Sequence, residues 1–160
     1  MRHLSSWRVR PAGFVSRFIA FSIDVVIISL TATLAVFCVN ELITFFGINI
    51  LISRWMVNAA NATTIKSALR VAVFLLGHIY AILYFAVFWS LIGYTPGKYV
   101  LKMRVVRMDG LRLGFWRSAL RAVGYYLSAI LLFGGFIWII FDKNRQGLHD
   151  KIVNTVVIYS

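Results

Sequence analysis

Two uninterrupted apolar stretches most constrain what this chain can fold into. Residues 18–39 hold one charged side chain in 22 positions, and residues 71–92 hold none apart from His78, which can titrate. A helix rises about 1.5 Å per residue, so each stretch can cross about 30 Å of hydrocarbon. Both are predicted to be transmembrane helices, and the expected fold class is an all-α integral membrane protein.

A third apolar run, residues 122–141, leaves two arrangements open. Its length is sufficient for a span, but Gly134 and Gly135 interrupt it. The run therefore either crosses the membrane or turns back as a re-entrant pair of half-helices.

The composition excludes an ordinary soluble enzyme. Apolar residues make up 61% of the 160 positions, and a chain this short cannot bury them all in its own core. The lipid bilayer is the partner expected to cover the remainder. Since no nucleophile elbow, phosphate-binding loop, dinucleotide fingerprint or metal-ligand spacing occurs, we expect no enzymatic activity, no cofactor and no metal.

The basic residues predict an orientation in the membrane. The chain carries 17 Lys and Arg against five acids, a net charge of +12. Because these residues flank apolar spans, anionic lipid headgroups are the expected partner and nucleic acid is not. Residues 1–17 hold four, 40–70 three and 93–121 seven, which places the N-terminus and 93–121 in the cytoplasm of a cell (inner or plasma) membrane.

Residues 99–115 predict a small cytoplasmic β-hairpin. A strand-like run, YVLKMRVVRM, is followed by the turn Asp109-Gly110 and by LRLGF as the return strand. A solvated loop is the alternative. The closing run KIVNTVVIY is also strand-like and needs a partner; if it pairs with the hairpin, the C-terminus is cytoplasmic and the third apolar run is re-entrant.

A short helix is expected directly after the hairpin. Residues 115–121 place Arg117 and Arg121 on one helix face beside aromatic residues. Such a helix is predicted to lie at the level of the lipid headgroups.

Asp24 is the most informative single residue. A charge inside a span costs roughly 2.5–3.5 kcal/mol on insertion scales. Arg17 precedes it by seven positions, and Thr31 and Cys38 continue the same spacing, so the four predict one polar stripe. Asp24 is then either a structural partner that locks helices together, with Arg17 as its counter-ion, or a protonatable, cation-binding carboxylate.

Other polar and small residues are secondary candidates. Thr31 and His78 lie within the two spans, where a lone His usually serves packing. Small residues at four positions predict close helix contacts within the bundle or between protomers. These are Gly77, Ala81, Gly124 and Ser128.

Three segments together resemble one family of small membrane proteins. They are RPAGFVSRFIAFSIDVVII near the start, GYTPGKYVLKMRVVRMDG in the middle and FDKNRQGLHDKIVNTVVI at the end. In this order they are similar to the RDD family, named for one arginine and two aspartates. The resemblance implies an RDD membrane domain over residues 10–159, preceded by a basic tail at 1–9.

The resemblance also assigns the three residues of the family name. Its arginine corresponds to Arg17 and its first aspartate to Asp24. Its second aspartate corresponds to Asp150 as first choice, with Asp142 as the alternative. The family implies a multi-pass membrane protein with a suspected transport role, and cation/proton exchange has been proposed for relatives.

Two functions follow as hypotheses. The first is transport of a small cation or proton that depends on these charged residues. Since one protomer has few spans to enclose a path, it implies a homo-oligomer or a partner membrane protein. The alternative is a non-transporting scaffold or assembly subunit whose charged residues fix helix packing.

Overall fold

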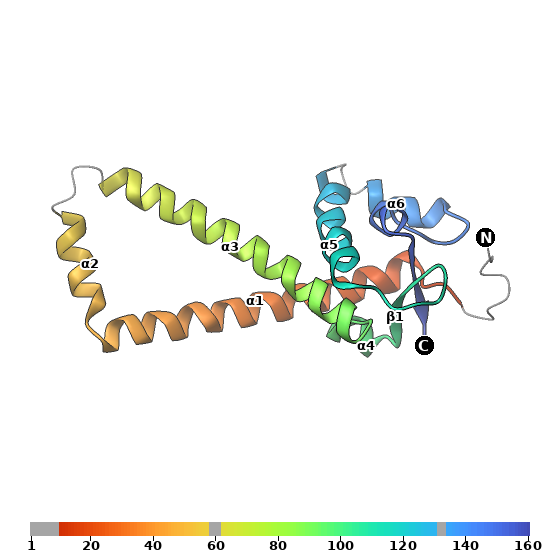
Figure 1. Cartoon of the computed structure of the whole chain (residues 1–160), viewed down its shortest axis with the longest axis horizontal. Helices are drawn as coiled ribbons and strands as arrows, with labels where there is room; N and C mark the ends of the chain where they lie inside the picture. Colours follow the sequence, from red (N-terminus) through yellow and green to blue (C-terminus); the bar gives the residue numbers. More distant parts are fainter. Residues whose placement is uncertain (1–9, 58–61, 131–133) are drawn as a thin grey trace. The chain divides into compact units, whose positions relative to one another are not determined.

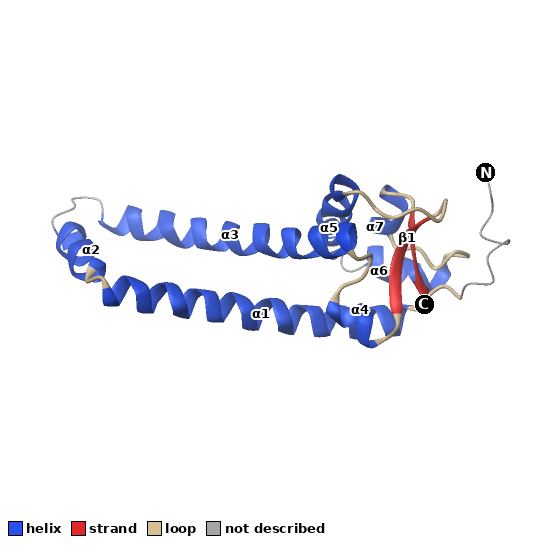
Figure 2. Ribbon diagram, turned by 60° about the horizontal axis from the view of Figure 1, so that its bottom comes forward, coloured by secondary structure: helices blue, strands red, loops and turns tan. Residues whose placement is uncertain are grey.

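The computed structural model describes residues 10–57, 62–130 and 134–160, and most of them are helical (Figures 1 and 2). The chain divides into two compact units. The polar unit comprises the described residues up to Val26 together with Ile82–Ser160, and the apolar unit comprises Ile27–Ala81. Two long helices, α1 and α3, contribute residues to both units.

The two predicted apolar helices are confirmed. Helix α1 (Phe14–Phe45) contains the predicted stretch 18–39, and α3 (Ala62–Leu91) begins nine residues before the predicted 71. By length and composition both can cross a membrane, and few side chains in their most apolar windows are buried. With 32 and 30 residues they are about 48 and 45 Å long, well above the thickness of the hydrocarbon layer.

Helix α2 (Ile48–Val57) lies in the connection between the two long apolar helices. Gly47 separates it from α1. Its φ of +66° is accessible to glycine without strain, and its amide donates to the Thr44 carbonyl at 3.0 Å. The break allows the chain to change direction between the two helices.

The polar unit contains a two-stranded sheet. Strand β1 (Met103–Arg107) pairs antiparallel with β2 (Thr155–Tyr159), with Val105 opposite Val157. The segment before α1 adds to the other side of β2, where the Ala12 amide donates to the Val157 carbonyl at 2.9 Å. Sequence-distant ends of the chain therefore meet at β2.

The predicted hairpin at 99–115 is correct only in its first half. Residues 103–107 form β1, and Gly110 forms a turn with a φ of +81°, but the LRLGF segment is not a strand. The partner of β1 is β2, as one of the alternatives for the closing run required. The physical reason is composition: TVVIY is β-branched and almost wholly buried, whereas LRLGF has an exposed Arg112 and Gly114.

The third apolar run is not confirmed as a span. Helix α5 (Phe115–Ile130) and helix α6 (Gly134–Phe141) divide it, and residues 131–133 lie outside the described residues. Among the described residues, α1 and α3 are the helices long and apolar enough to span. Helix α5 packs against both α6 and α7 (Leu148–Ile152) within the polar unit.

The helix predicted at 115–121 forms the start of α5, but its two arginines differ. Arg117 is exposed, whereas Arg121 has no exposed surface. The expectation that Arg121 lies at the headgroups is therefore wrong. Other buried residues of α5 follow at three- and four-residue spacing, which defines the face that packs inward. They include Ser118, Ala122 and Ser128.

Gly124 is the contact point between α5 and α7, and it generates a prediction. A Cβ there would lie 2.9 Å from the His149 Cβ and 3.1 Å from its Cα. Gly124→Leu should therefore lower the free energy of unfolding by about 1–3 kcal/mol or more through overpacking. Thermal unfolding of the detergent-solubilised protein measures the effect.

Gly77→Leu is the matched control. No described atom lies within 4 Å of a Cβ built at Gly77, so the predicted close approach there is not present among the described residues. Leucine also has the higher helix propensity, and the substitution should leave stability unchanged or slightly raised. Equal losses in the two variants would contradict the contact at Gly124.

Candidate functional site

Helix α1 presents three buried side chains on one face near its start. Arg17, Ala20 and Asp24 are its buried residues, at spacings of three and four. Asp24 has no exposed surface, and Arg17 is 8% exposed. Thr31 and Cys38, further along the predicted polar stripe, are exposed. The stripe is therefore buried only in its first half.

The Asp24 carboxylate accepts hydrogen bonds from several elements of the polar unit. Its Oδ1 accepts from the Gly97 amide at 2.8 Å and from the Tyr84 hydroxyl at 3.1 Å. Its Oδ2 accepts from the Thr95 hydroxyl at 2.5 Å. The Lys98 Nζ lies 4.0 Å from Oδ2. Three uncharged donors and one ammonium thus surround the carboxylate.

Gly97 makes this arrangement possible. It belongs to α4 (Pro96–Val100), where Pro96 occupies the first turn, a position that needs no backbone donor. A Cβ at Gly97 would lie 2.1 Å from the Ala20 carbonyl oxygen and 2.9 Å from the Asp24 Cγ. Only glycine allows the backbone this close to α1. The TPGK sequence at residues 95–98 therefore supplies donors that bind the Asp24 carboxylate.

A second carboxylate, Asp150, is held by two arginines. Arg17 Nη1 lies 2.5 Å from its Oδ2, and Arg121 donates to its Oδ1 through both Nε, at 3.0 Å, and Nη2. The Gly147 amide, at the start of α7, donates to Oδ2 at 3.1 Å. Arg121 and Asp150 have no exposed surface. This ion pair joins α1, α5 and α7.

Trp89 links the two carboxylate sites. The indole ring is fully buried, with the Lys98 Nζ 5.2 Å and the Arg121 Cζ 4.5 Å from its centroid. Cation–π attraction stabilises both contacts. The five charged side chains form one group, here called the charge cluster, in which three are basic and two acidic. Its members are Arg17, Asp24, Lys98, Arg121 and Asp150.

Burial and mutual repulsion shift the proton affinities in the cluster. Burial, reinforced by Arg121, lowers the pKa of Lys98 from 10.5 to about 7, although Asp24 opposes the shift. Burial alone would raise the pKa of Asp150, but Arg121 and Arg17 hold it well below its usual range. Burial lowers the pKa of the neighbouring His149 to about 3, so its imidazole is neutral at pH 7.

The structure gives the predicted site residues different partners. Arg17 pairs with Asp150, so the interpretation of Arg17 as the counter-ion of Asp24 is wrong. Asp142 instead pairs with Lys151 at 2.6 Å and accepts the amide of Gln146 in the turn before α7. Asp150, not Asp142, is thus the aspartate that Arg17 contacts.

Thr31 and His78 belong to the apolar unit. The Thr31 Oγ1 lies 2.8 Å from the Tyr80 hydroxyl and donates to the Ile27 carbonyl. The His78 Nδ1 lies 2.8 Å from the Phe74 carbonyl oxygen, one turn back on the same helix. Both side chains have local partners outside the charge cluster.

Lys98, Arg121 and Trp89 were missed as members of the site. Lys98 lies in a turn motif and Arg121 at the edge of an apolar run, where charged residues are usually solvated. One sequence signal could have indicated that Arg121 is buried. Arg121, Gly124 and Ser128 share a helix face of small or polar residues. In the described residues, no group of three His, Cys, Asp or Glu side chains could hold a metal ion.

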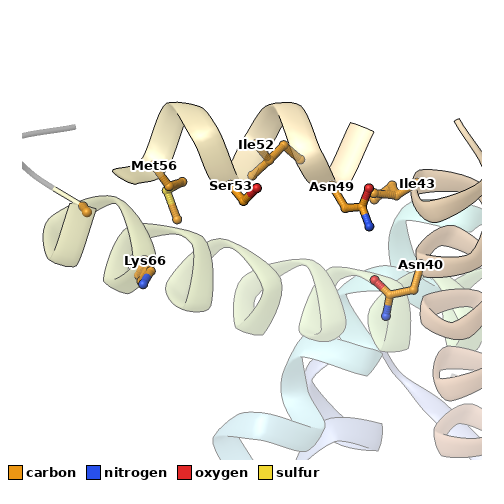
Figure 3. A pocket seen from close by; sticks show the side chains of 8 residues that line it. Asn40, Ile43, Asn49, Ile52, Ser53, Met56 and Lys66 are labelled. Carbon is orange, nitrogen blue, oxygen red and sulfur yellow. The ribbon is translucent and has the colours of Figure 1, made fainter. Parts of the chain in front are cut away.

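The apolar unit contains an open pocket of about 800 Å³ near α2 (Figure 3). Its polar lining comes from Asn40 of α1, Asn49 and Ser53 of α2, and Lys66 of α3. None of the residues predicted from the sequence lines it. Because it lacks a carboxylate among its lining residues, it offers no counterpart to the charge cluster.

Asp150 should be more important for stability than Asp142. Asp150→Asn leaves two buried guanidinium groups without their anion, which should lower the free energy of unfolding by about 3–5 kcal/mol. Asp142→Asn removes a partly exposed ion pair but keeps an oxygen for the amide bonds, and should cost less than about 1 kcal/mol. Denaturation of both variants in detergent provides the comparison, and a larger loss for Asp142→Asn would contradict the assignment.

The buried His149 should make stability depend on pH below neutrality. Its pKa is about 6.5 when unfolded and about 3 when folded, so the unfolded chain binds more protons between these values. Stability should therefore fall as the pH is lowered from 6.5 towards 3. The slope between pH 6.5 and 4.5 should be smaller in His149→Gln, measured by thermal unfolding. An unchanged slope would assign the dependence to another group.

Comparisons with known proteins place this chain in a family. The chain is 30% identical over 151 residues to the uncharacterized protein YxaI of Bacillus subtilis, which covers 94% of this chain and 98% of that protein. It is 41% identical over 68 residues to a proline-rich antigen homolog of Mycobacterium tuberculosis, covering 42% of this chain but 28% of the antigen homolog. No solved structure matches significantly.

The family match includes every member of the charge cluster. The RDD family matches residues 11–154, which begin before Arg17 and end after Asp150. Two long apolar helices accompany the match, as a membrane protein requires. The chain therefore belongs to the RDD family.

Proposed function

We propose that this protein is a transporter that exchanges protons for a small cation, with Asp24 as the binding carboxylate. The observation that carries the proposal is the burial of Asp24 on an apolar helix with a basic side chain, Lys98, 4.0 Å from its Oδ2. A carboxylate removed from water requires a positive partner or a proton. Here the partner is an ammonium group that can itself lose a proton.

Lys98 supplies the proposed coupling between protons and cations. Its pKa of about 7 means that the ammonium loses its proton near physiological pH, whereas an ordinary lysine does not. Once the Nζ is neutral, Asp24 keeps its three uncharged donors but lacks a positive partner. A small monovalent cation then binds at the carboxylate. Reprotonation of Lys98 restores the ion pair and releases the cation.

The proposal also covers the assembly of the transporter and its orientation in the membrane. Two spans cannot enclose a water-filled path, so the transporter acts as a homo-oligomer or with a partner membrane protein. We place it in the cell membrane with the N-terminus and residues 93–121 in the cytoplasm. Exposed basic side chains of this segment contact anionic headgroups. They include Arg104, Arg112 and Arg117.

A scaffold without transport is the second candidate, and one observation favours it. Asp150 is saturated by Arg17, Arg121 and the Gly147 amide, and none of these donors is exposed beyond 8%. Such a group holds helices in one arrangement and leaves no position for a ligand. If Asp24 serves the same purpose, the charge cluster fixes packing for an assembly partner.

Flux into proteoliposomes tests the transport proposal. The purified full chain should acidify or alkalinise the lumen in response to a sodium or potassium gradient, as reported by a pH-sensitive dye. Asp24→Asn is nearly isosteric but cannot ionise, so it should abolish the flux. Lys98→Arg keeps a positive charge that cannot be released, and it should also abolish pH-coupled flux.

Asp142→Asn is the matched control, because it removes a carboxylate outside the charge cluster and should keep wild-type flux. Thermal unfolding of each variant shows that loss of flux is not loss of folding. Absence of flux in the wild-type protein favours the scaffold. Wild-type flux in a folded Asp24→Asn variant would refute the role of this carboxylate.

A further inference from the structure

Three buried polar groups of the polar unit have no hydrogen-bond partner among the described residues. They are the Arg121 Nη1, the Trp89 Nε1 and the Ser118 hydroxyl. All three residues have no exposed surface. An unsatisfied buried donor is destabilising, and native proteins satisfy nearly all of them. Three such groups together require an acceptor that the described residues do not provide.

The three groups belong to one neighbourhood of the polar unit. Ser118 precedes Arg121 by three positions, so both lie on the same face of α5. The Arg121 Cζ lies 4.5 Å from the centroid of the Trp89 ring. The Nε and Nη2 of Arg121 are fixed on Asp150, which leaves Nη1 as the remaining nitrogen of an immobilised guanidinium.

The charge balance favours an anion over water as the acceptor. While Lys98 is protonated, three positive side chains face two carboxylates in the charge cluster, and His149 is neutral at pH 7. Both carboxylates already accept hydrogen bonds from their own donors. A water molecule must also donate its two hydrogens, and it leaves the excess charge in place. An anion accepts from several donors and offsets that charge.

We propose that the polar unit binds one small monovalent anion of about the size of chloride beside the charge cluster. Arg121 Nη1 holds it, and the Ser118 hydroxyl and the Trp89 indole N–H are its further donors. The anion completes the packing between α3 and α5. Neither Asp24 nor Lys98 is one of its donors, so the halide experiment tests it separately from the transport proposal.

Anion-dependent thermal stability tests the site. The detergent-solubilised full chain is unfolded in sodium gluconate, which is replaced stepwise by sodium chloride or sodium bromide at constant ionic strength. Both halides should raise the Tm in a saturable way, by roughly 3–6 °C at about ten times the Kd. A Tm that does not respond to halide overturns the proposal and assigns the acceptor to water.

Variants that each remove one donor locate the effect. Ser118→Ala and Trp89→Phe keep the packing volume nearly unchanged, and each should raise the half-saturating halide concentration about tenfold. Ser128→Ala is the control, because this buried hydroxyl of the same helix already donates to the Gly124 carbonyl at 2.8 Å. It should lose stability but keep the halide response.

Two further outcomes decide against the site. An unchanged half-saturating concentration in Ser118→Ala shows that halide binds elsewhere. An equal change in Ser128→Ala shows a general effect of weakened packing. Should Trp89→Phe fail to fold, Ser118→Ala alone decides, because it deletes one oxygen atom that has no hydrogen-bond partner among the described residues.

Discussion

The burial of two arginines against a single aspartate is the constraint on which the polar unit depends. Neither guanidinium can remain in a closed interior without an anion, and Asp150 serves both. Because the three residues come from α1, α5 and α7, neutralising them brings these helices together. The sheet follows, since Arg17 also donates to the Ala12 carbonyl beside β2. Packing of apolar surface then further stabilises the helix arrangement that these ion pairs require.

Asp24 is satisfied by different means. Its ion-pair partner lies at 4.0 Å, and its short contacts come from a hydroxyl and a backbone amide that Gly97 brings within reach. A carboxylate held by uncharged donors can exchange its positive partner without losing its position, whereas Asp150 cannot. The two buried aspartates therefore differ in physical character. Asp150 is held by permanent cations, whereas the cation beside Asp24 can lose its charge.

Local signals in the sequence predicted local structure well. The two apolar helices, the turn at Asp109-Gly110 and the first strand follow from composition and turn chemistry. To predict that β1 pairs with β2, one must know that TVVIY is buried on both faces. That burial depends on residues far away in the sequence. For the same reason Arg17 was matched to Asp24, its neighbour on the helix, and not to Asp150, which is 133 residues away. Helical periodicity cannot reveal contacts of that range.

The separation of 133 residues between Arg17 and Asp150 also determines when their ion pair can form during synthesis. A ribosome adds about 5–20 residues per second, so about 7–27 s pass between the appearance of Arg17 and that of Asp150. Once Leu91 has been added, and until Asp150 follows, both apolar helices are complete while Arg17 has no permanent anion. Nascent chains must therefore pass through a state in which the first helix is loosely held. A chaperone or insertase that shields cationic helix ends would act on this state.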